Sequence, residues 1–211
     1  MTVQGSTEHY ATLAAAVLQD RCAANRSLEA HHRSRYHSSR IPGITLMDYL
    51  RRVGKYSRCS PECLIIAVVY LDRYVAATHI PITFRNVHRL VIVAILVAAK
   101  IRDDIYYSNS YYGSIGGLHL KELNELELDF VKTLNWTTFV RPEEYHLYLS
   151  EITRRYDVDT QQNTAQDDLS VLKANSKEAS PRPRDGPTPT KSTGAYAGAS
   201  VSSNGDPVES N

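Results

Sequence analysis

The run VIVAILVAA, Val91–Ala99, is the longest apolar stretch in the chain and decides its fold. It is too short to cross a bilayer, which takes about 20 residues in a helix, so it predicts a buried helix over about residues 86–102. Just before it, residues 61–78 are apolar on nearly every face between Leu64 and Leu71, and they predict a second central helix. Two such helices need others to cover them, which favours a globular helical bundle.

Helical spacing of apolar residues continues on both sides of this pair. It predicts helices at residues 8–21, from Thr45 to Val53, at 119–134 and at 141–156. Thr45 is expected to cap its helix, and the hydroxyl of Ser60 to cap the helix over residues 61–78. The segment YYSNSYYGSIGG, Tyr106–Gly117, is too rich in Gly, Ser and Asn for a helix interior and predicts a loop. No stretch alternates at period two long enough to make a convincing strand, so we expect an all-α fold.

Composition divides the chain into three parts. We expect an N-terminal helix and a basic connector over residues 1–41, one compact domain over residues 42–156 and a disordered tail over residues 157–211. The tail holds five of the nine prolines and no Trp, Phe or Ile, so it cannot bury enough apolar surface to order its backbone. It also holds Ser180 and Thr188, each followed by proline, as candidate sites of proline-directed phosphorylation.

The charge, the first residues and the cysteine count of the chain argue against several classes of protein. A net charge of +1 argues against a chain built mainly to coat nucleic acid or a membrane, although 5 basic and 8 acidic side chains in residues 157–211 leave an excess of four positive charges on the rest. The first eight residues are polar, so we expect no signal peptide. Three cysteines, an odd and small number, favour a reducing compartment: the cytoplasm, the nucleus or both.

Two charged residues lie where the helix patterns call for apolar ones. Lys100 ends the most apolar helix, on the same face as Val97. Glu127 lies between Leu123 and Phe130, inside the apolar stripe of the helix over residues 119–134. A buried charge is costly unless it is paired, so the two residues are candidates to meet. In the alternative interpretation, Lys100 extends past the helix end into solvent and Glu127 only borders its stripe.

The order of motifs in the chain resembles a cyclin box, the five-helix fold of the cyclins. The motifs are YLRRVGKYSRCSPECLIIAVVYLDRYV (49–75), LVIVAILVAAKIRDD (90–104) and LNELELDFVKTLNW (123–136). The resemblance covers about residues 8–155 and is closest to the single-box P/U-type cyclins, also called PHO-type, whose marks here include Ser108-Asn109 and Gly116-Gly117-Leu118. It implies a single five-helix box with an N-terminal flanking helix.

The resemblance also implies a function. A chain of this kind binds and activates a cyclin-dependent protein kinase, in cell-cycle progression or in nutrient and phosphate signalling. The residues that the resemblance places at the kinase are Lys100, Asp104, Asn109 and Glu127. It further implies that Asp72 and Arg73 stabilise the box from within. Residues 46–50 read LMDYL, without the Met-Arg-Ala-Ile-Leu patch through which many cyclins dock substrates, and no second five-helix repeat follows the box.

Other kinds of chemistry have less support in the sequence. No phosphate-binding glycine loop, zinc-protease motif or nucleophile elbow is present, so we expect neither an enzyme nor a cofactor. Cys59 and Cys63 have poor spacing for zinc and no second cysteine pair, so we expect no metal site. The alternative function is a cyclin-fold module that binds nucleic acid or serves transcription, because Arg33, Arg35 and Arg40 make the connector basic. A scaffold that binds a kinase without activating it is a third interpretation. We expect no membrane contact and no homo-oligomer.

Overall fold

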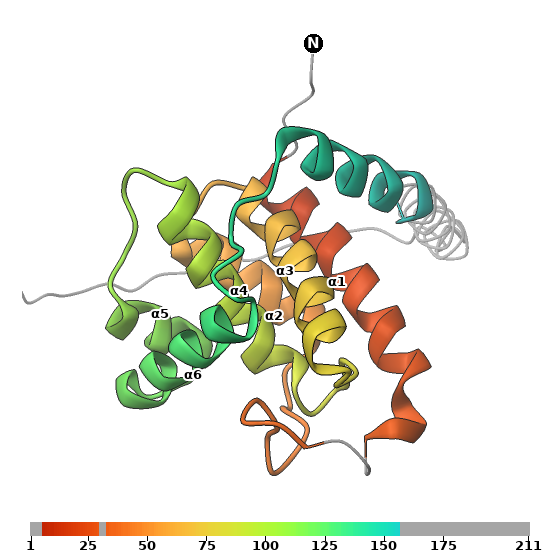
Figure 1. Ribbon diagram of the computed structural model, residues 1–211, viewed down its shortest axis with the longest axis vertical. Coiled ribbons are helices and arrows are strands. Elements are labelled where there is room, and N and C mark those ends of the chain that lie inside the picture. The colour runs from red at the N-terminus through yellow and green to blue at the C-terminus, as the bar shows by residue number, and fades with distance from the viewer. Residues whose placement is uncertain (1–5, 30–32, 157–211) are drawn as a thin grey trace, which may run out of the picture. The chain divides into compact units, whose positions relative to one another are not determined.

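The computed structural model describes residues 6–29 and 33–156, all within the first of two units, Met1–Leu169 and Ser170–Asn211. Every regular element in this part of the chain is helical, as predicted (Figure 1). The labelled elements are α1 (Thr7–Ala24), the 3-10 turn η1 (Arg26–Leu28), α2 (Leu46–Ser57), α3 (Glu62–Thr78), α4 (Val87–Arg102), α5 (Asn109–Gly116) and α6 (Leu120–Thr133). Residues 142–156 form a further helix.

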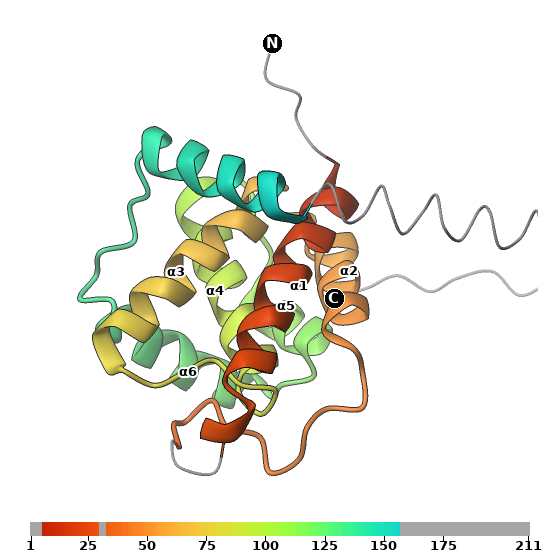
Figure 2. The ribbon, with the colours of Figure 1, turned by 90° about the vertical axis from the view of Figure 1, so that its right-hand side faces the viewer.

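Helix α4 is the centre of the bundle, as its apolar run predicts. It packs against α2, α3, α5 and α6, and every residue from Leu90 to Ala99 is buried. Helix α3 is the second central helix and packs against α1, α4 and α6, while α1 lies against α2 and α3 (Figure 2). This burial of apolar surface is the main source of stability in the domain.

Residues at the helix ends connect neighbouring elements. The Thr45 hydroxyl accepts a hydrogen bond from Asp48 N at 3.1 Å, which confirms the predicted cap of α2. The cap expected from Ser60 is wrong, because α3, which lies wholly within the described residues, has no side-chain cap. Ser60 N instead donates to Asp103 Oδ2 at 2.9 Å. This bond ties the start of α3 to the end of α4. The helix-start motif at Ser60 therefore marks a junction between two helices.

The loop predicted over residues 106–117 is in part a helix, α5. The Ser108 side chain caps its start by accepting from Tyr111 N, and Gly117 ends it in the left-handed region at φ 73°. Its glycines allow close packing: a Cβ at Gly113 would lie 2.7 Å from the Leu118 carbonyl oxygen. The prediction failed because it interpreted these glycines as flexible backbone, whereas the fold needs their missing side chains.

The connector, described over residues 33–41, has no regular structure but is anchored by one buried side chain. Tyr36 is fully buried, and its hydroxyl donates to the Leu126 carbonyl at 2.9 Å and lies 3.2 Å from Asp129 Oδ2 on α6. The predicted tail, with Ser180 and Thr188, lies outside the described residues. Among the described residues, none of the helices has the length and apolar character that a membrane crossing requires.

Candidate functional site

Lys100 and Glu127 meet at the end of α4. Lys100 Nζ donates to both carboxylate oxygens of Glu127, at 2.7 and 2.9 Å. The side chains are 29% and 18% exposed, so each charge is partly withdrawn from water yet reachable from outside. The pairing follows from the pattern of the sequence, because each helix carries one charge on an otherwise apolar face and each charge neutralises the other.

Asn109 adds a third helix to this contact. It is the first residue of α5, and its Nδ2 donates to Glu127 Oε2 at 2.6 Å and to Asn124 Oδ1 at 2.7 Å. The four residues Lys100, Asn109, Asn124 and Glu127 are called the polar junction below. Because three packed helices contribute to the junction, the packing of these helices fixes the positions of its side chains. Sequence reasoning did not assign Asn124 to the site, although its position one turn before Glu127 on α6 is a usable signal.

Asp104 does not take part in this network. Its side chain is exposed, and the structure records no hydrogen bond or ion pair between it and any other described residue. The structure therefore brings together three of the four residues expected at the kinase, Lys100, Asn109 and Glu127, and leaves Asp104 apart.

Apolar side chains that neighbour the junction residues in the sequence are exposed. Ile101 follows Lys100 and is 56% exposed, Leu128 follows Glu127, and Ile105 in the segment between α4 and α5 is 89% exposed. Exposed apolar side chains around a fixed polar group are typical of protein-binding surfaces. The junction can thus present oriented hydrogen-bonding groups at the centre of an apolar contact.

Asp72 and Arg73 both hold the bundle together, but each through a different partner. Asp72 forms a bidentate ion pair with Arg21 of α1. Arg73 pairs with both carboxylate oxygens of Glu144, at 2.9 and 2.7 Å, and donates to the carbonyls of Thr137 and Phe139. These contacts fasten α3 to α1, to the helix over residues 142–156 and to the segment before that helix. The predicted stabilising role fits this geometry, and neither residue reaches the polar junction by a recorded contact between described residues.

A second ion pair joins the helices that carry the Lys100–Glu127 pair. Arg89 Nη1 of α4 lies 2.6 Å from Glu122 Oε1 of α6, and the two side chains are 27% and 33% exposed. Its length is close to that of Lys100–Glu127 and both of its side chains are also partly buried, although Glu122 is more exposed than Glu127, and it lies near the opposite end of α4. It is therefore an internal reference for what such a pair contributes to the fold alone.

The cysteines are buried, and no zinc-like arrangement surrounds them in the described residues. The Cys59 thiol nearby and burial raise the pKa of the Cys63 thiol far above its usual range. Across residues 6–29 and 33–156, no group of three or more His, Cys, Asp or Glu side chains could hold a metal ion. His31 and His32 lie outside the described residues.

Comparisons with known proteins agree with this geometry. The cyclin family model matches residues 4–138. Cyclin-U4-1 of Arabidopsis thaliana is 45% identical over 123 residues, which cover 56% of this chain and 59% of that protein. Cyclin-P3-1 of Oryza sativa subsp. japonica is 36% identical over 119 residues, covering 56% and 50%. The Nuc-1 negative regulatory protein preg of Neurospora crassa is 36% identical over 134 residues, covering 63% and 28%. The chain thus matches about half to three fifths of the length of the two plant relatives.

Proposed function

Because the chain belongs to the cyclin family, we propose that it binds a cyclin-dependent protein kinase and activates it without catalysing a reaction itself. Its likeness to plant U- and P-type cyclins confirms the resemblance seen in the motifs. The observation that carries the proposal is the polar junction: a charge pair held by three helices, partly buried and flanked by exposed apolar side chains.

The junction binds the kinase through its unused hydrogen-bonding capacity. Both Lys100–Glu127 bonds lie within one ion pair, so Lys100 keeps a third N–H, and the Glu127 carboxylate keeps lone pairs beyond those that Lys100 and Asn109 use. These groups bind backbone N–H and C=O groups of the kinase's regulatory helix, while Ile101, Ile105 and Leu128 pack around them. A backbone partner presents both N–H donors and C=O acceptors, which explains why a cation and a carboxylate are needed side by side.

Activation is then a shift of population. A kinase is active when its Lys–Glu ion pair and its metal-binding aspartate are both in place. A partner that binds the regulatory helix better in that arrangement stabilises the active state by the difference in binding free energy. The cyclin touches no substrate atom in this mechanism.

The cellular role follows from the same likeness. We place the chain in cell-cycle progression or in nutrient and phosphate signalling, acting in the cytoplasm, the nucleus or both, as a single copy on its kinase. The name of the Neurospora relative describes a negative regulator of Nuc-1, which is consistent with a role in controlling another protein.

Affinity purification tests the proposal. The full chain, carrying a small affinity tag, should retain a protein kinase in stoichiometric amount, identified by mass spectrometry, and the purified complex should phosphorylate a general kinase substrate faster than the kinase alone. Retention of a kinase with no gain in activity would reduce the function to scaffolding. Absence of any kinase from the purified material would overturn the proposal.

A further inference from the structure

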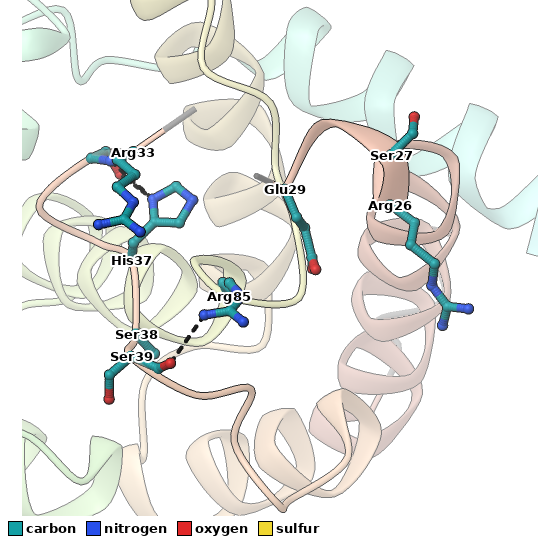
Figure 3. A pocket seen from close by; sticks show the side chains of 9 residues that line it. Arg26, Ser27, Glu29, Arg33, His37, Ser38, Ser39 and Arg85 are labelled. Carbon is teal, nitrogen blue, oxygen red and sulfur yellow. Dashed lines mark hydrogen bonds between the residues drawn. The ribbon is translucent and has the colours of Figure 1, made fainter. Parts of the chain in front are cut away.

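A polar cavity of about 850 Å³ lies away from the polar junction (Figure 3). Its walls come from η1, from the connector and from the loop before α4, and the nine described residues that line it are three arginines, four serines, one histidine and one glutamate. Figure 3 shows Arg33 and His37 on one side, Arg85 near the centre, and Glu29 and Arg26 on the other side. The volume falls within the range of about 300–1,000 Å³ that is common for ligand sites.

The connector wall of the cavity is built by specific hydrogen bonds. Arg85 Nη1 donates to the Ser39 carbonyl at 3.0 Å, and Ser38 N donates to the Arg85 carbonyl at 2.7 Å. Ser34 N donates to His37 Nδ1 at 2.9 Å, so the ring hydrogen lies on Nε2. Together with buried Tyr36, these bonds fix the connector against the loop before α4. The connector wall of the cavity is therefore preformed.

Seven arginines outside the cavity have an acidic partner, whereas the three that line it, like five exposed arginines elsewhere in the domain, have none among the described residues. Arginines 21, 35, 51, 73, 89, 154 and 155 each form an ion pair with an acidic side chain. Arg26, Arg33 and Arg85 form no ion pair with any described residue. Glu29 is the one acidic side chain among the described lining residues, so the walls carry an excess of positive charge.

This combination of groups suits a phosphoryl group. The guanidinium fork of arginine matches the oxygens of a phosphate, and serine hydroxyls donate further hydrogen bonds to them. A concave site with a few fixed donors differs from the extended basic surface that nucleic acids require. We propose that this cavity binds phosphoryl groups, either on a phosphoserine or phosphothreonine side chain of a peptide or on a free phosphate compound.

The cavity and the polar junction lie near opposite ends of α4. Arg85 precedes the helix by two residues and Lys100 lies in its last turn, so about 22 Å separates them along the axis at 1.5 Å per residue. A ligand in the cavity therefore leaves the junction open. The site stands whether or not the chain activates a kinase.

Binding measurements on the full chain test the site with two kinds of probe. One is a fluorescent peptide with a single phosphothreonine, compared with its unphosphorylated twin by fluorescence anisotropy. The other is pyrophosphate, measured by calorimetry. The site variants are Arg33→Gln, whose side chain is exposed and has no recorded hydrogen bond or ion pair with another described residue, and Arg85→Gln. The matched control is Arg40→Gln, which removes the same charge from an exposed position of the connector outside the cavity. Thermal unfolding establishes that each variant is folded.

The expected result is saturable binding of at least one phosphorylated probe and none of the unphosphorylated twin. Loss of one charged hydrogen bond should weaken binding at least about tenfold for Arg33→Gln and Arg85→Gln, and Arg40→Gln should stay within about twofold of the parent chain. Tighter binding of the phosphopeptide than of pyrophosphate identifies the ligand as a phosphorylated protein segment. Tighter binding of pyrophosphate identifies it as a free phosphate compound. The proposal is overturned if neither probe binds, if Arg40→Gln weakens binding as much as Arg33→Gln, or if a single-stranded RNA binds better than both probes.

Discussion

Replacing Lys100 or Glu127 by alanine should impair kinase binding far more than it impairs folding. In the free chain the two side chains are 29% and 18% exposed, so water screens their attraction in part. Exposed pairs contribute about 0–1 kcal/mol and breaking buried pairs costs about 3–5 kcal/mol. For this intermediate burial we expect either substitution to lower the free energy of unfolding by about 1–2 kcal/mol.

Kinase binding raises the energetic cost of removing Lys100 or Glu127. A bound kinase would cover the junction, so the remaining partner would be a buried charge without its counter-ion. Truncating one member of a buried, hydrogen-bonded charge pair in an interface costs about 2–5 kcal/mol, which is about 30- to 5,000-fold in the dissociation constant. The two single variants should therefore lose binding to a similar extent. The double variant Lys100→Ala/Glu127→Ala should lose much less than the sum of the two losses, because no orphaned charge is left.

The Arg89–Glu122 pair provides the control. It joins the same two helices with a similar length and exposure, so Arg89→Ala and Glu122→Ala should lower the free energy of unfolding by a similar amount, about 1 kcal/mol. They should leave the dissociation constant within about twofold, because that end of α4 lies away from the junction. The assays are urea unfolding followed by circular dichroism, and biolayer interferometry against the co-purified kinase. Equal losses of kinase binding in both pairs, or unchanged binding in Lys100→Ala and Glu127→Ala, would refute the central role of the junction.

Three further predictions concern the fold. Gly113→Ala should lower the free energy of urea unfolding by roughly 1–3 kcal/mol, because its Cβ would press on a backbone carbonyl. Gly43→Ala, with open space around it, should change it little. Burial lowers the pKa of His88 in the folded chain. As the pH falls, the unfolded chain therefore binds a proton at His88 before the folded chain does. Stability should therefore fall as the pH drops below about 6.5, and the melting temperature of His88→Gln should vary less between pH 7 and 5.5. Arg73→Ala removes the ion pair to Glu144 and should speed proteolysis within residues 142–156; an unchanged cleavage rate would contradict its role as a fastener.

Lys100 and Glu127 could be predicted because a charge in an apolar stripe violates a regular pattern. The pattern places both side chains on buried faces, and the cost of an isolated buried charge then requires a partner. The pairing thus follows from two local observations and one energetic rule. Asn109 was reached through the motif resemblance, since a polar residue at the start of a short helix violates no pattern.

Helix α5 could not be predicted for a related reason. Propensity scales treat glycine as a helix breaker because they measure an isolated helix, in which the missing side chain only adds backbone freedom. At Gly113 the neighbouring backbone leaves no room for a Cβ, so packing outweighs propensity. Nothing within residues 106–117 indicates that neighbour, because the packing surface belongs to α2, α4, α6 and the chain after α5.

The arginine-lined cavity illustrates the limit of local patterns most clearly. Arg33 and Arg85 are 52 residues apart, neither lies inside a regular helix, and each taken alone is an ordinary solvated cation. The sequence shows the excess of basic residues in the connector but not which of them are paired. Arg35 lies 3.8 Å from Asp129, while Arg33, two residues away, has no acidic partner among the described residues. An unpaired arginine is a property of the folded chain, because it depends on which carboxylates the fold brings near. Sites of this kind therefore become visible only when the ion pairs of the domain are assigned and three of the remaining arginines prove to line one cavity.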